Sequence, residues 1–79
     1  MDTKKFPLGI ATSAADVGRL AARRRKAQGL TQADVAGLGQ VGTRFVSELE
    51  RGKGTLQFDK VLHVLGLLGL DAAIVERGA

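Results

Sequence analysis

The sequence predicts a compact all-α domain of four to five helices that ends in a short β-strand. Two short segments with helical apolar spacing, residues 30–36 and 41–52, flank a small-residue corner at which a tight turn is expected. An amphipathic segment precedes them, and a strongly apolar segment, residues 56–68, follows them. Two short helices joined by a tight turn form a helix-turn-helix, a pattern typical of DNA binding.

The size of the chain predicts one domain with a partner subunit. Its 79 residues are too few for two hydrophobic cores, and burial in so small a domain is marginal without unusually good packing or dimerisation. We divide the chain into a flexible N-terminal arm (1–12), a helix-turn-helix domain (13–69) and a dimerisation strand with its tail (70–79).

Composition excludes several classes of site. The chain has no cysteine and one histidine, so a disulfide framework and a metal site are not expected, and no cofactor is expected. No apolar run is long enough to span a bilayer, and the first residues lack the apolar segment of a secretory signal. We therefore expect a cytoplasmic protein that is associated with the nucleoid and has no membrane partner.

The net charge of +4 is concentrated in the first third of the chain. Residues 1–29 carry seven basic and two acidic side chains, whereas residues 30–79 carry five basic and six acidic ones. A positive field favours a polyanionic partner, although it would equally keep an ordinary domain in solution.

The first helix is expected from Ser13 to Gln28. Ser13 is an N-cap, Asp16 approximates a capping box, and Gly29 supplies the C-terminal stop. Its inward apolar positions are Val17, Leu20 and Ala21. Its basic stripe is formed by Arg19, Arg23 and Lys26. That stripe is either a solvated helix face or a source of positive potential for DNA.

The helix-turn-helix begins at Thr31, which is a good N-cap. Val35 and Ala36 form the inner face of its first helix, and either Gly39 or Gln40 must take the turn. A close approach of the two helices accounts for the small residues at the corner, which are Ala36, Gly37 and Gly39. Val46 and Leu49 face inward on the second helix, so the residues between them face outward.

The segment after residue 55 is apolar nearly all round, which points either to a subunit interface or to a central core helix. His63 is expected on the surface of that helix or at the interface. Residues 70–76 alternate loosely and are too short for a stable helix. They form either a strand that pairs with its symmetry mate or a frayed tail.

The motif from Leu30 to Lys53 resembles the phage-repressor and Cro (XRE) type of helix-turn-helix. A narrower resemblance, to the HipB-type antitoxins, is carried by residues 23–32, 42–46, 49–53, 60–62 and 68–70. It implies a homodimer that represses its own operon at a palindromic operator in double-stranded DNA. It also implies a HipA-like serine/threonine kinase toxin as partner and a final strand that pairs across the dimer.

The resemblance assigns site residues by position. The residues assigned to base reading are Thr43, Arg44, Phe45, Ser47 and Glu48. Those assigned to the DNA backbone are Thr31, Gln32, Gly42, Lys53 and Thr55. Arg25 and Glu50 correspond to a structural ion pair between the first helix and the reading helix. The expected dimer contacts are Val61, Leu65, Leu68, Leu70, Ala72 and Ile74.

Two of these assignments have an open alternative. Phe45 is suited either to a thymine methyl or to the core, and Glu48 is suited either to cytosine N4 or to a structural role, because an acid near phosphates is repelled. The chain also departs from the family pattern at Gln40, where the turn usually has glycine.

The function that follows is a sequence-specific repressor acting as the antitoxin of a HipA-like kinase. Two alternatives stay open, namely an autonomous regulator without a toxin and a protein-interaction module that has lost DNA binding. An enzyme is not expected, since no nucleophile motif, carboxylate pair or phosphate-binding glycine loop is present.

Overall fold

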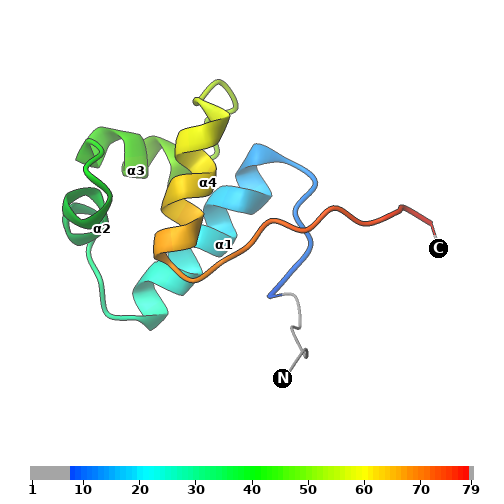
Figure 1. Ribbon diagram of the computed structural model, residues 1–79, viewed down its shortest axis with the longest axis horizontal. Coiled ribbons are helices and arrows are strands. Elements are labelled where there is room, and N and C mark those ends of the chain that lie inside the picture. Colours follow the sequence, from blue (N-terminus) through cyan, green and yellow to red (C-terminus); the bar gives the residue numbers. More distant parts are fainter. Residues whose placement is uncertain (1–7, 79) are drawn as a thin grey trace.

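The computed structural model describes residues 8–78, which contain four α-helices and no strand. The helices are α1 (Ala14–Ala27), α2 (Gln32–Gly39), α3 (Thr43–Glu50) and α4 (Phe58–Leu67). Helix α3 packs against α1 and α2, and α4 packs against α2. Figure 1 shows α1 and α4 in the centre, with α2 and α3 on one side and the extended segment of residues 70–78 on the other. The all-α class is confirmed, with four helices.

Helix α1 begins where the sequence predicts. The Ser13 hydroxyl accepts a hydrogen bond from the Asp16 amide at 3.1 Å. The reciprocal bond differs from that of a capping box, because the Asp16 carboxylate accepts from the amide of Thr12 at 3.0 Å. That backbone hydrogen bond, with a second bond from Arg19, lowers the pKa of Asp16 to about 2. Gly29 follows the helix at φ +73°, as its expected role as a stop requires.

The turn between α2 and α3 is made by Gln40, not by Gly39. Gln40 adopts the left-handed conformation (φ 55°, ψ 41°), and the amide of Val41 donates to the carbonyl of Ala36 at 3.0 Å. Gly39 is instead the last helical residue, and a Cβ there would lie 2.6 Å from Leu67 Cδ1. Gly39 therefore leaves room for the Leu67 side chain beside α2, and the left-handed turn falls on a glutamine, a residue that rarely adopts a positive φ.

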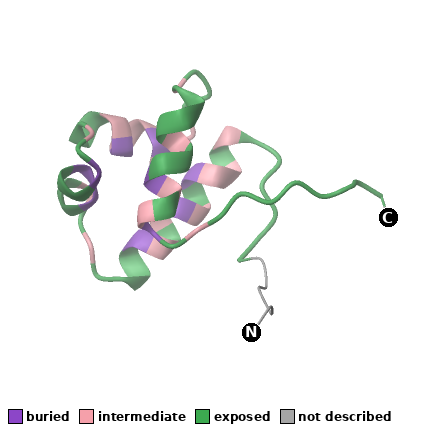
Figure 2. Ribbon diagram, in the orientation of Figure 1, coloured by how far each residue is buried: buried purple, intermediate pink, exposed green. Residues whose placement is uncertain are grey.

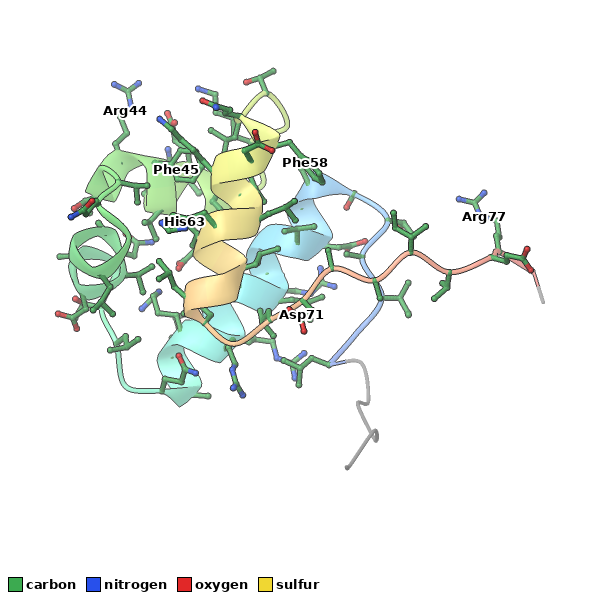
Figure 3. All side chains as sticks on the ribbon, viewed as in Figure 1. Arg44, Phe45, Phe58, His63, Asp71 and Arg77 are labelled. Carbon is green, nitrogen blue, oxygen red and sulfur yellow. The ribbon has the colours of Figure 1, made fainter. Side chains whose placement is uncertain are left out.

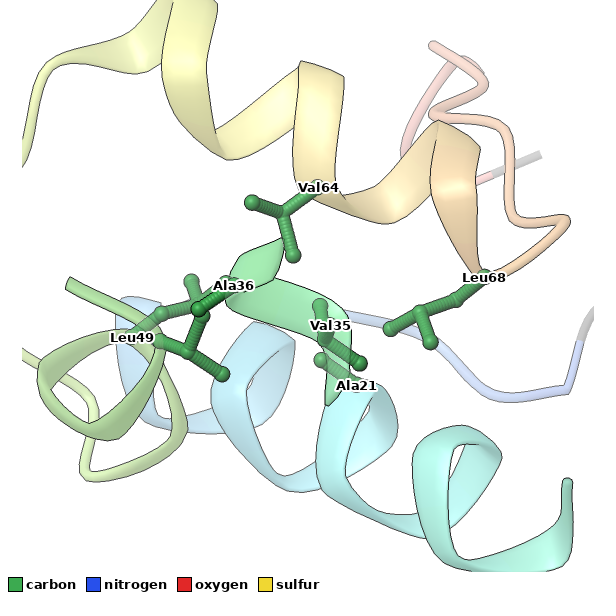
Figure 4. Packing of buried hydrophobic residues seen from close by; sticks show 7 residues of the cluster. Ala21, Val35, Ala36, Leu49, Val64 and Leu68 are labelled. Atoms are coloured by element: carbon green, nitrogen blue, oxygen red, sulfur yellow. The ribbon is translucent and has the colours of Figure 1, made fainter. Parts of the chain in front are cut away.

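Each helix contributes to one hydrophobic core, shown in Figure 4. Its buried members are Ala21, Val35, Ala36, Val46, Leu49, Val64 and Leu68. Figure 2 shows these buried positions on the facing sides of the helices. The assignments of Ala21, Val35, Ala36, Val46 and Leu49 to inner faces are confirmed. Gly37 is an exception at the corner, because a Cβ there would meet nothing within 4 Å. The prediction that a close approach of two helices requires a small residue at position 37 is therefore wrong.

The apolar side chains of α4 differ in how far they are buried. Val64 and Leu68 are each 1% exposed, whereas Phe58 is 68% exposed and Leu62 37% exposed. Leu68, which the sequence assigned to a dimer interface, instead stabilises the core of its own domain. Val61, Leu65 and Leu70 are partly buried against the same core. The helix is thus a core helix on one side and presents apolar side chains to solvent on the other.

Residues 70–78 leave the helical body as an extended segment, visible at the right of Figure 1. Ala72 is exposed and Ile74 is 100% exposed. No part of residues 8–78 forms a strand, so strand pairing across a dimer stays a prediction. Most of the predicted N-terminal arm, residues 1–7, lies outside the described residues.

No helix within residues 8–78 has the length and apolar character needed to cross a membrane. The same part of the chain holds no group of three or more histidine, cysteine or acidic side chains that could bind a metal ion.

Candidate nucleic-acid interface

Helix α3 presents one buried face and one open face. Gly42 is its N-cap, and its first two residues, Thr43 and Arg44, are exposed. Val46 and Leu49 hold the opposite face in the core, where they are 1% and 3% exposed. Figure 3 shows Arg44 pointing away from the body of the protein. The first turn of α3 is therefore free to enter a groove as wide as the major groove of DNA.

A buried ion pair ties the end of α3 to α1. Arg25 Nε and NH2 donate to the two carboxylate oxygens of Glu50 at 2.6 and 2.9 Å, and Arg25 NH1 donates to the Leu30 carbonyl at 2.8 Å. The two side chains are only 11% and 9% exposed. Such bidentate geometry fixes the relative position of two helices as well as their distance.

Gln32, the first residue of α2, extends this pair. Its side-chain amide donates to Glu50 Oε1 at 3.0 Å. Burial acts to raise the pKa of Glu50, but the hydrogen bonds from Arg25 and Gln32 outweigh it, so the pKa lies below its ordinary value. The same Arg25–Glu50 hydrogen bond raises the pKa of Arg25 above its ordinary value. Glu50 is therefore a carboxylate at neutral pH, and three elements meet at it.

Thr31 closes the N-terminus of α2 with a full capping box. Its hydroxyl accepts from the Asp34 amide at 3.0 Å, and its own amide donates to the Asp34 carboxylate at 2.8 Å. The bond from the Thr31 amide lowers the pKa of Asp34. The expected capping role of Thr31 is confirmed, and its expected contact with the DNA backbone stays a prediction.

A second set of charges lies on the open face of α3. Glu48 Oε2 accepts from Arg44 Nε at 3.1 Å and from Lys53 Nζ at 3.3 Å. The hydrogen bond from Arg44 is the main reason that the pKa of Glu48 lies below its usual value. Ser47, one residue earlier, accepts from Arg51 NH1 at 2.8 Å. Arg44, Ser47, Glu48 and Lys53 thus form one polar surface across α3 and the following loop.

Phe45 and Thr55 are placed differently from this surface. Phe45, labelled in Figure 3, is partly buried and packs against the hydrophobic core. Its position therefore favours the core alternative over contact with a thymine methyl. Thr55 is exposed in the loop that joins α3 to α4.

Three residues with structural roles escaped the sequence interpretation. Gly18 is buried where α1 meets the end of α3, and a Cβ there would overlap the Leu49 carbonyl oxygen. His63 Nε2 lies 3.0 Å from the Gly39 carbonyl at the end of α2. Arg24 Nε donates to the Leu68 carbonyl at 2.8 Å, at the end of α4. Only Gly18 had a signal in the sequence, namely a glycine within an otherwise regular helix. The contacts of His63 and Arg24 join residues more than 20 positions apart, so no local pattern indicates them.

Comparison with known proteins agrees with this architecture. Residues 16–77 match the family described as helix-turn-helix domain. The chain is 47% identical over 64 residues to y4mF of Sinorhizobium fredii, an uncharacterised HTH-type transcriptional regulator; the match covers 81% of this chain and 84% of that protein.

Two solved structures share the fold. A HipB–O4 20mer complex and a structure named MDT Protein each superpose with a TM-score of 0.81 at 16% identity, covering 89% of this chain and 99% of the other. The HipB likeness that the motifs predicted is therefore present in the backbone.

Proposed function

We propose that this chain, which belongs to the helix-turn-helix domain family, is a homodimeric transcriptional repressor that reads a palindromic operator with α3. The observation that carries the proposal is the exposed Arg44 on the first turn of α3, a helix anchored from behind by the Arg25–Glu50 pair. An arginine fork in the major groove donates two bonds to guanine O6 and N7. Its place of action would be the cytoplasm, at the nucleoid.

The proposed interface divides into base-reading and positioning residues. Thr43, Arg44 and Ser47 lie on the side of α3 that would face the bases. Contacts to phosphates, which position the protein without specifying sequence, are assigned to Thr31, Gln32, Gly42, Lys53 and Thr55. The surrounding positive charge would steer the protein to DNA in a salt-dependent manner.

Arg44→Ala tests the proposed base reading. We expect the preference for DNA from immediately upstream of the gene over a scrambled duplex to fall about 5- to 150-fold per half-site, which corresponds to about 1–3 kcal/mol. Fluorescence anisotropy at two salt concentrations measures both duplexes. The matched variant Lys53→Ala should bind both duplexes more weakly, by the same factor. It should also reduce the slope of log affinity against log salt concentration by about 1, the value for one phosphate contact.

An equal, salt-labile affinity of the wild-type protein for both duplexes would contradict the proposed repressor. That result would favour the alternative of a protein-interaction module, in which Arg44→Ala leaves partner binding intact.

The homodimer is proposed from the apolar side chains left outside the core. Phe58 and Leu62 lie one turn apart on α4, and Ile74 is 100% exposed on the extended tail. A lone extended segment of this kind is satisfied most simply by pairing with the same segment of a second copy. In that arrangement Leu70, Ala72 and Ile74 would share one face of the strand. Val61 and Leu65 of α4 would contribute further dimer contacts.

Ile74→Asp is expected to weaken the dimer at least about 100-fold, because each interface would bury an unpaired carboxylate. Sedimentation equilibrium across a concentration series measures this change. Val75→Asp is the matched control, since adjacent strand residues point to opposite faces, and it should leave the dimer largely intact. A wild-type protein that is monomeric at micromolar concentration would contradict the proposal.

The finer role that we propose is that of an antitoxin to a HipA-like kinase, autoregulating the operon of both proteins. The HipB-like motifs and the HipB-like backbone support it. Co-expression with a kinase encoded by the neighbouring gene tests it, with growth rescue and co-purification expected. A regulator that binds its operator but neither rescues growth nor binds the kinase would be autonomous.

A further inference from the structure

We infer that Glu48 is a positioning residue that holds the Arg44 guanidinium in the orientation that reads guanine, rather than a reader of cytosine. This inference rests on the proposed function and names the specificity of the same surface. It separates the two roles that the sequence left open for Glu48.

Glu48 is much less accessible than Arg44. The Glu48 side chain is 13% exposed, whereas that of Arg44 is 87% exposed. A side chain that reads a base edge must project beyond its own helix surface into the groove. Arg44 does so and Glu48 does not.

One of the two carboxylate oxygens of Glu48 is already in use. Its Oε2 accepts from Arg44 Nε at 3.1 Å and from Lys53 Nζ at 3.3 Å. At Oε2 a cytosine N4 amino group would have to compete with two cations, and charge-assisted hydrogen bonds are stronger than neutral ones.

The far end of the Arg44 guanidinium stays open to a ligand. Within residues 8–78, Arg44 makes its side-chain hydrogen bond through Nε, with Glu48 as acceptor. NH1 and NH2, at the far end of the planar group, point into solvent as a two-donor fork. This fork is the part that matches O6 and N7 of guanine.

The contact with Glu48 also lowers the entropic cost of binding through Arg44. An exposed arginine has many rotamers, and fixing one of them on binding costs free energy. Glu48 lies one helical turn from Arg44, the spacing at which side chains meet on a helix surface, so the pair selects the rotamer before DNA arrives. Lys53 compensates the carboxylate, which keeps this surface net positive toward phosphates.

The test compares Glu48→Met with Glu48→Gln. Both variants remove the negative charge and keep the length of the side chain, but only glutamine keeps an oxygen that can accept from Arg44 Nε. The probe is a duplex selected by the wild-type protein from a randomised library, and a set of copies in which each guanine in turn carries 7-deazaguanine. That base keeps Watson–Crick pairing and lacks the N7 acceptor.

We expect one guanine per half-site at which removal of N7 weakens wild-type binding. Glu48→Met should reduce this N7 effect about tenfold, Glu48→Gln should retain most of it, and both should bind a scrambled duplex more tightly than the wild-type protein does. In an Arg44→Ala background, Glu48→Met should change nothing further at that guanine, as a double-mutant cycle requires of a residue that acts through Arg44. Circular dichroism and thermal unfolding confirm that each variant is folded.

Three results with these variants would overturn the inference. These are an N7 effect in Glu48→Met equal to that of the wild type, an equal loss in the methionine and glutamine variants, and a loss that persists without Arg44. Selection of a site without any N7-dependent guanine would overturn it as well. Failure of the wild-type protein to select any sequence is a different result, since it would remove the proposed function itself.

Discussion

Glu50→Ala is expected to lower the free energy of unfolding by about 3 kcal/mol. The substitution leaves the Arg25 guanidinium buried without its carboxylate and removes the acceptor of the Gln32 amide. In a domain of this size that loss corresponds to a fall in the melting temperature of about 10–25 °C at fixed protein concentration. Because Glu50 is the last residue of α3, operator affinity should fall too, although the side chain points away from the open face. Thermal unfolding followed by circular dichroism measures the stability.

The exposed pair of Arg19 and Asp16 supplies the control. Its N–O distance is 3.1 Å, but the Arg19 side chain is 57% exposed. Arg19→Ala should therefore change stability by less than about 1 kcal/mol. A double variant, Arg25→Met with Glu50→Leu, should recover much of the stability lost in Glu50→Ala, because apolar side chains of similar size carry no desolvation penalty. A fall in stability no larger than that of Arg19→Ala would show that the buried pair is not the anchor of α3.

Gly18→Ala is expected to destabilise the protein by about 2–3 kcal/mol, even though alanine is the better helix former. The new Cβ would overlap the Leu49 carbonyl oxygen and lie 2.8 Å from that of Glu50. Both obstacles are backbone atoms, so α1 and α3 would have to separate, and the Arg25–Glu50 pair that spans them would lengthen. Chemical denaturation measures the stability, and anisotropy measures the accompanying loss of operator affinity.

The same substitution at Gly37 is the matched control, with the opposite sign. Gly37 is helical and exposed, and a Cβ there would meet nothing within 4 Å. Gly37→Ala should therefore stabilise the protein by up to about 1 kcal/mol through helix propensity alone. Equal effects at the two positions would refute the close approach of α1 to α3 as the reason for glycine at position 18.

Local signals in the sequence were enough for the helices, whereas the strand predicted over residues 70–76 is not formed in residues 8–78. Ser13 and Thr31 cap α1 and α2 through their own hydroxyls, and Gly29 ends α1 with a positive φ. Capping and apolar spacing are decided within a few residues, so they can be predicted without knowledge of the tertiary structure. The motif from Leu30 to Lys53 likewise indicated the helix-turn-helix family, to which the chain belongs.

The tertiary structure decided which of several equivalent residues takes each role. Glycine is the residue that adopts a left-handed turn most easily, yet the structure places Gln40 in the turn and keeps Gly39 helical, next to the Leu67 side chain of α4. Leu62 and Leu68 look alike in sequence, but the packing of α4 buries the second and leaves the first partly exposed. The need for glycine at position 18 follows from the packing of α1 against α3, where a Cβ would overlap the Leu49 carbonyl oxygen. Caps and periodicity depend on neighbours along the chain, whereas close approach and burial depend on distant segments, and that is why sequence alone determined the helices and the family while tertiary packing determined the contacts.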